Sequence, residues 1–248
     1  MLLLGLWLVA LATCDLLRST RDHVEARRAS WIGLFGVLLF AFLVVAAGAD
    51  SAWVLCVAVV TGLGLFVFVV ASARALNLQG GPAATRSRQV ALAAMGVSLA
   101  LLLVTAGRTS LPGGLLLRGY DGLAIDSLGP LPFGDLFLVL GLFLFQLASA
   151  NIVVRIILDG VGVPPEASEL QIKGGRLLGP LERLFILGLG LAGQVTAASI
   201  VIAAKGILRY PELAASTGDL QAARRHAEYI LVGSFLSWLI AMAGLPLL

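Results

Sequence analysis

Long apolar runs dominate the chain, and they predict its secondary structure. Each run holds roughly the 20 residues that an α-helix needs to cross the hydrocarbon core of a bilayer. Polar and apolar residues do not alternate at period two, so an outer-membrane barrel is not expected. The fold class predicted is therefore all-α, a polytopic helix bundle of about seven membrane segments, at residues 1–17, 31–49, 53–73, 90–106, 136–158, 184–204 and 230–248.

The segment 184–204 has two interpretations. Its length suits one full span. However, Gly188, Gly190, Gly193 and Gln194 interrupt it halfway, and small or polar residues follow. A re-entrant pair of half-helices is the alternative, which a membrane protein tolerates only where the bend is buried in protein or faces water.

The basic residues predict the orientation, because positively charged loops stay in the cytoplasm. Of the 17 basic residues, eleven lie near the ends of the first, third and fifth spans, on one side of the membrane. A single span at 184–204 divides the basic residues 11 against 6, and a re-entrant segment divides them 15 against 2. Both interpretations place the N-terminus outside the cytoplasm.

Composition supports a membrane protein and excludes several other classes. Hydrophobic residues make up 59% of the chain, only 12% of residues are charged, and the mean hydropathy is +1.01. The net charge of +3 is interpreted as membrane topology, so no nucleic-acid partner is expected. Cys14 and Cys56 both lie in apolar runs and are expected to be buried free thiols, with no zinc site.

The chain is expected to form a single transmembrane domain, with N-terminal helices at 1–106, an extracytoplasmic flap at 107–134 and C-terminal helices at 135–248. The flap is rich in Gly and Pro but also in Leu, so it is predicted to lie on the outer membrane face with turns as its only regular structure. Gly179-Pro180 predicts a further turn, before the helix that follows the fifth span.

Glycines at 188, 190 and 193 have the spacing of a dinucleotide-binding loop. That function is rejected, because no strand precedes the glycines and the surrounding residues are apolar. Small residues let helix backbones approach closely, so the expected role is helix packing, as for the pairs Gly193/Ala197 and Gly233/Ser237.

Ionisable and polar residues at the ends of the last two apolar segments form the candidate site. Charge is costly in lipid unless it is paired or hydrated. A re-entrant topology would gather these residues at the cytoplasmic side, with Glu228 beside Lys205 and Glu182 beside Arg155 or Arg209. They act either as an ionic clamp between helix ends or as a site for an ion, proton or lipid headgroup. The candidate residues are Arg155, Glu182, Arg183, Gln194, Lys205, Arg209 and Glu228.

Four ordered blocks in the C-terminal part resemble a known family. They run from Asn151 to Arg155, from Lys173 to Leu184 (with Gly179-Pro-Leu-Glu-Arg183), from Ala203 to Tyr210, and from Glu228 to Ser237. Residues 149–248 thereby resemble the bacterial membrane family known as domain-of-unknown-function family three-three-zero-seven. The resemblance implies a bacterial membrane protein but no established activity. Members of that family open with a membrane helix containing His and Asp, whereas residues 1–17 contain Asp15 and no His.

Three functions remain open from the sequence. The first is transport or handling of a small molecule, ion or lipid through the cytoplasm-facing polar cluster, in a bacterial inner membrane. The second is a non-catalytic subunit or scaffold, with a protein partner or a homo-oligomer. An intramembrane lipid-modifying enzyme ranks last, because the sequence shows no nucleophile, metal ligands or P-loop. Membrane lipids are expected partners, and no cofactor or metal is expected.

Overall fold

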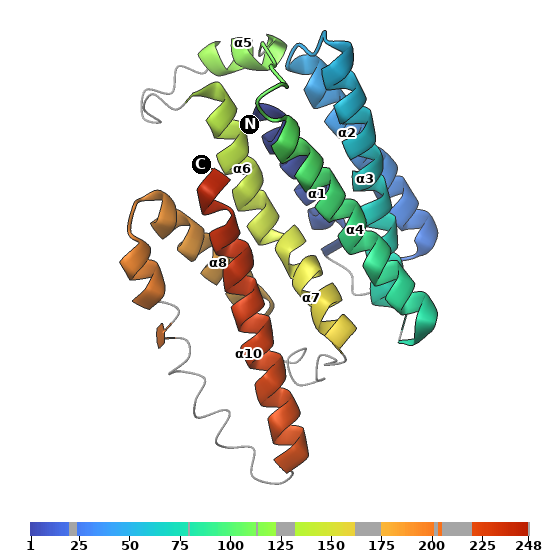
Figure 1. The fold of residues 1–248 in the computed structure, drawn as a ribbon, viewed down its shortest axis with the longest axis vertical. Coiled ribbons are helices and arrows are strands. Elements are labelled where there is room, and N and C mark those ends of the chain that lie inside the picture. The colour runs from blue at the N-terminus through green and yellow to red at the C-terminus, as the bar shows by residue number, and fades with distance from the viewer. Residues whose placement is uncertain are drawn as a thin grey trace. The chain divides into compact units, whose positions relative to one another are not determined.

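The computed structural model of the chain is all-helical over the residues that it describes, which confirms the all-α fold class. These residues are 1–19, 24–78, 80–112, 114–122, 132–161, 175–200, 203–204 and 220–247, with side chains described at all of them except 19, 175–178 and 220–230. The helices are α1 (Leu2–Ser19), α2 (Ala26–Ala46), α3 (Ala52–Asn77), α4 (Gly81–Thr105), α5 (Gly114–Gly122), α6 (Phe133–Leu147), α7 (Ser149–Val161), α8 (Gly175–Leu191), α10 (Leu220–Ala243) and the short 3-10 helix η2 (Leu245–Leu247) (Figure 1).

Several of these helices can cross a membrane. Among the described residues, α2, α3 and α4 are each long and apolar enough to do so. The pair α6 and α7 also qualifies if it is counted as one broken span, because the two helices meet at a bend of 46°. The predicted continuous helix at 136–158 is therefore interrupted, at Ala148. Within the described part of the chain, the helices that qualify number three or four, fewer than the seven segments expected.

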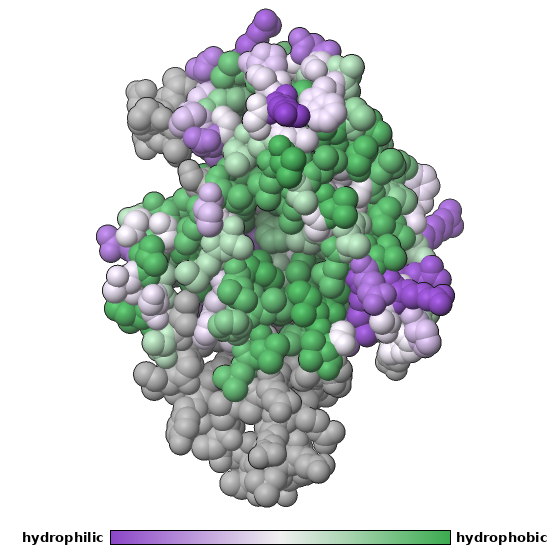
Figure 2. Space-filling model, viewed as in Figure 1, coloured by the Kyte–Doolittle hydropathy of each residue, from purple (hydrophilic) through white to green (hydrophobic). Residues whose placement is uncertain are grey.

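The outward faces of the long helices explain why they suit a bilayer. Along α2 the exposed side chains are large and apolar and recur every three or four residues, a spacing that places them on one stripe of the helix. The stripe consists of Trp31, Leu34, Phe35, Leu38, Phe42 and Val45. In Figure 2 the surface of α4 is mainly hydrophobic, and hydrophilic residues gather where α3 joins α4. Cys56 also lies exposed on α3, so its expected burial is wrong: a residue in an apolar run is not buried when it lies on the outward face of its helix.

The chain forms two compact units, residues 1–149 and 150–248. In the first unit α1 is the central helix and packs against α2, α3, α4 and α6. Trp7 is fully buried there, and its indole N–H donates to the carbonyl of Thr61 at 2.9 Å. Gly5 on α1 and Gly141 on α6 face each other, so the two helix backbones lie in contact.

The flap at 107–134 contains a helix, α5, so the expectation of turns alone is wrong. Its leucines and Arg118 favour helix formation, and the helix lies on the surface with none of its residues buried. Gly114 at its start packs against the backbone around Gly48, at the end of α2. The ring of Tyr120 meets the edge of Phe133, which joins α5 to the start of α6.

The second unit contains α7, α8, α10 and η2, and Ile186, Ala198 and Ala241 form a small apolar core in it. Gly179-Pro180 lies inside α8, so the predicted turn there is wrong. Helix α8 ends at Leu191, and helix resumes at residues 195–200 after a sharp bend (Figure 1). Gly193 sits in that break with a φ of +72°, a value that glycine adopts without strain.

The glycines predicted to pack helices therefore have different roles. Gly193 is exposed with open space around it, so it serves a turn and its predicted packing is wrong. Gly190 does lie in close contact, because a Cβ there would come within 2.4 Å of the Leu245 side chain. Gly233 on α10 packs against the side chain of Leu158.

Candidate functional site

A buried ion pair lies near the C-terminal end of α1, the central helix of the first unit. Asp15 and Arg18 are one helical turn apart, which places both side chains on the same face. The Arg18 Nε donates to Asp15 Oδ1 at 2.8 Å, and Arg18 Nη2 lies 2.7 Å from the same oxygen. Asp15 is 0% exposed and Arg18 is 5% exposed, so the pair is withdrawn from both water and lipid.

Helix α3 provides the second set of partners for Arg18. The guanidinium Nη1 donates to the carbonyl of Val69 at 3.0 Å and to the Ser72 hydroxyl at 2.8 Å. Ser72 in turn donates to the carbonyl of Phe68, one turn earlier on its own helix. The guanidinium carbon also lies 5.7 Å from the centre of the Phe68 ring, within cation–π range. Arg18 thus joins α1 to α3 through two hydrogen bonds and one cation–π contact.

The second oxygen of Asp15 differs from the first. Among the described residues, Asp15 Oδ2 has no hydrogen-bond partner although it is buried. The hydroxyl of Ser149 is close enough to interact with this carboxylate, but the two groups are not oriented for a hydrogen bond. Within the described part of the chain, the buried Ser149 hydroxyl also has no hydrogen-bond partner. An unpaired buried polar atom costs about 1–3 kcal/mol. Such atoms are rare in native cores and mark places that a water, proton or ion can complete.

Sequence reasoning assigned other roles to this pair. The pattern of residues 1–17 predicts a membrane span, and Arg18 follows it as a basic residue of the next loop. The signal was nevertheless present, because an acid and a base three residues apart at the end of an apolar run can pair inside a bundle. The sequence does not show which face of α1 packs against α3.

The structure describes the side chains of only some residues of the predicted polar cluster. Arg183 is buried at 2% exposure, Glu182 is half-buried, and Arg155 and Gln194 are exposed. Glu228 lies on α10, in the stretch whose side chains are not described, and Lys205 and Arg209 lie outside the described residues. The pairs expected for Glu228 and Lys205, and for Glu182 with Arg155 or Arg209, stay predictions.

Arg183 instead joins three of the C-terminal blocks. Its Nη1 donates to the Ser237 hydroxyl of α10 at 2.8 Å, and its Nη2 donates to the side-chain oxygen of Asn151 on α7. Gly179 lies one turn earlier on α8, beside this contact: a Cβ there would lie at ordinary van der Waals distances, 3.7 Å from Arg183 Nη1 and 3.9 Å from the Asn151 oxygen. Glu182 adds a neighbouring negative charge. Three helices of the second unit therefore meet at one guanidinium.

No protein-family model, no curated protein and no solved structure matches this chain. The resemblance of residues 149–248 to the family of unknown function thus stays a prediction. Within the described residues, no group of three or more His, Cys, Asp or Glu side chains is placed to hold a metal ion. The two buried networks, around Asp15–Arg18 and around Arg183, are accordingly weighed by their own chemistry.

Removing one acceptor from Arg183 tests the network of the second unit. Ser237→Ala leaves a buried guanidinium N–H without its partner, so the free energy of unfolding should fall by about 1–3 kcal/mol. Ser199→Ala is the matched control, because Ser199 is exposed and bonds only to Val195 of its own turn. Thermal unfolding of the purified protein in detergent measures both. Equal midpoints for the two variants would contradict this geometry.

Proposed function

We propose that the chain is a multi-pass protein of a bacterial inner membrane that binds and passes a proton or small cation at Asp15. The observation that carries this proposal is the buried, unsatisfied second oxygen of Asp15. An ionic clamp needs no such atom, because a clamp is most stable when all of its polar groups are paired. Carboxylates buried in membrane helices typically serve ion or proton paths.

The partners of Arg18 make two states of Asp15 chemically reasonable. When the carboxylate is ionised, Arg18 neutralises it through Oδ1. When a proton or cation binds at Oδ2, the guanidinium keeps the Val69 carbonyl and the Ser72 hydroxyl as acceptors. The guanidinium therefore keeps two hydrogen bonds when Asp15 is neutralised, but its buried positive charge then lacks a counter-ion, so the neutral state of Asp15 is the higher in energy.

The proposed topology places this site toward the cytoplasm. With the N-terminus outside, the C-terminal end of α1 lies at the cytoplasmic side, where the basic residues around the first and third spans gather. The bundle is proposed to have about seven membrane segments, including a re-entrant pair at 184–204. The break between Leu191 and residue 195 supports the re-entrant pair, because it divides the apolar segment into two shorter helical pieces.

Proton flux into proteoliposomes tests the proposal. The purified chain is reconstituted with a trapped pH dye, and a potassium diffusion potential drives protons inward. Asp15→Asn should abolish the flux that the natural chain supports. Asp50→Asn, the same substitution in the exposed turn before α3, should retain that flux.

Other outcomes of this assay would contradict the proposal. If Asp15→Asn lowers thermal stability while the flux of the folded fraction is unchanged, the pair is a clamp. If the natural chain passes no more protons than empty liposomes, the same assay with sodium or potassium gradients tests a cation. Absence of all three fluxes would overturn an ion-handling function.

A further inference from the structure

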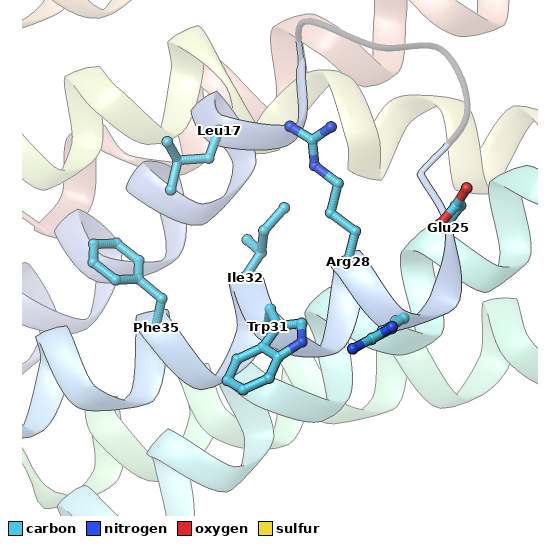
Figure 3. A pocket seen from close by; sticks show the side chains of 7 residues that line it. Leu17, Glu25, Arg28, Trp31, Ile32 and Phe35 are labelled. Atoms are coloured by element: carbon cyan, nitrogen blue, oxygen red, sulfur yellow. The ribbon is translucent and has the colours of Figure 1, made fainter.

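A hollow lies on the surface of the first unit, between the end of α1 and the first turns of α2 (Figure 3). It has a volume of about 410 Å³. Leu17 forms one wall, and Arg28, Trp31, Ile32 and Phe35 of α2 form the other. The hollow is separate from the Asp15–Arg18 pair, which is buried inside the bundle.

The walls of the hollow are apolar and open to the surroundings. Leu17 is 47% exposed, Trp31 62% and Phe35 45%. Phe35 also belongs to the exposed stripe of α2, which continues along the helix through Leu38 and Phe42. A molecule seated here would thus lie with its apolar part along the lipid-facing side of α2, as an acyl chain does.

The rim of the hollow is basic. Arg27 and Arg28 occupy the first turn of α2, and Figure 3 shows the Arg28 side chain extending beside the hollow toward α1. Glu25 is the acidic residue among the described lining residues, and it points away from the apolar walls in the same view. Glu25 makes no side-chain cap to α2, and two cations in a first turn are unfavourable to the helix dipole. An anion bound at this rim would neutralise the two arginines and interact favourably with the N-terminal end of the α2 dipole.

From this combination we infer that the hollow binds one anionic phospholipid. Its phosphate would meet Arg27 and Arg28, and an acyl chain would lie against Leu17, Ile32 and Phe35. Trp31 fits the boundary between them, because its ring favours the interface of headgroup and hydrocarbon. A free phosphate would leave the apolar walls unused, and a neutral lipid would leave the two arginines unmatched.

The position of the hollow agrees with a headgroup region. The side-chain nitrogen of Asn77, at the end of α3, donates to the Val24 carbonyl just before α2 at 2.6 Å. The hollow therefore lies at the same end of the unit as the α3–α4 turn, where Arg74 and Arg86 are exposed. Basic residues collected at one end of membrane helices attract anionic lipids.

Native mass spectrometry of the full chain in detergent tests the inference. Phosphatidylglycerol and phosphatidylcholine with the same acyl chains are titrated against the protein, and the first bound lipid is quantified. Phosphatidylglycerol should bind more tightly. Arg27→Gln/Arg28→Gln should weaken its binding roughly 25-fold, about fivefold for each arginine. Arg74→Gln/Arg86→Gln removes the same charge at the same end and should leave that first binding step unchanged.

A second variant tests the apolar wall without touching the charges. Leu17→Trp should fill the hollow and weaken phosphatidylglycerol binding while both arginines remain. Equal binding of the two lipids, equal losses in the two double variants, or full binding by Leu17→Trp would each overturn the inference. None of these results depends on proton flux, so the lipid site and the function proposed for Asp15 succeed or fail separately.

Discussion

Arg18→Met is expected to lower the free energy of unfolding by about 3–5 kcal/mol, because it leaves the buried carboxylate of Asp15 without its counter-ion. Asp15 is fully buried, and its first oxygen is held by Arg18 alone among the contacts described here. The substitution also removes the bonds from α1 to Val69 and Ser72 of α3. The thermal unfolding midpoint of the purified protein in detergent measures the loss.

Two companions separate charge from packing in this experiment. Asp15→Leu/Arg18→Met replaces the pair with apolar side chains and should recover most of the lost stability, because desolvation of both charges is avoided. Arg74→Met removes an exposed arginine at the end of α3 and should change stability by no more than about 0.5 kcal/mol. A double variant as unstable as Arg18→Met alone would show that packing, and not the unpaired charge, accounts for the loss.

Gly5→Ala is expected to destabilise the first unit by about 2–3 kcal/mol through overpacking. A Cβ at Gly5 would lie 2.7 Å from the backbone nitrogen of Leu138 and 2.7 Å from the carbonyl carbon of Phe137. These are backbone atoms of α6, so no side-chain rotation relieves the clash. The opposite residue, Gly141, is equally confined, since its Cβ would lie 2.8 Å from the Gly5 oxygen.

Gly96→Ala is the matched control for that substitution. Gly96 lies inside α4 with nothing near its Cβ direction, so alanine there should be neutral or raise stability by up to about 1 kcal/mol. Unfolding of both variants in detergent gives the comparison. If Gly5→Ala were as stable as Gly96→Ala, α1 and α6 would have to lie farther apart than the structure places them.

The helices themselves followed from local sequence. Runs of apolar residues predicted α2, α3 and α4, and the structure extends α2 and α4 earlier, to Ala26 and Gly81. The extensions contain Ala and Arg, which favour helix but not lipid, so a criterion based on hydropathy ends before the helix does. The interruption near Gly193 was likewise visible, because glycine and glutamine break an apolar pattern.

Two features of the structure do not follow from the predicted pattern. The bend at Ala148 lies between the polar residues Gln146 and Ser149, inside a run whose overall apolarity predicts one span, and α5 lies in a segment whose Gly and Pro content predicts turns. The candidate site has the same limitation. Glu182 and Arg183 were chosen because they are charged residues next to a span, yet Arg183 meets the neutral partners Asn151 and Ser237. Hydrogen bonding to distant helices leaves no trace in local composition.

The sequence by itself determined that the chain is helical and suited to a membrane, because helix length and apolarity are properties of consecutive residues. Tertiary structure alone decided that α1 is the buried centre of the first unit. It also decided that Asp15 and Arg18 turn inward to Ser72. The physical reason is that α1 is apolar around its whole circumference from Leu2 to Ala12, so this part of its pattern does not distinguish lipid from protein as its surroundings. Only the close approach of α2, α3 and α6 makes that distinction.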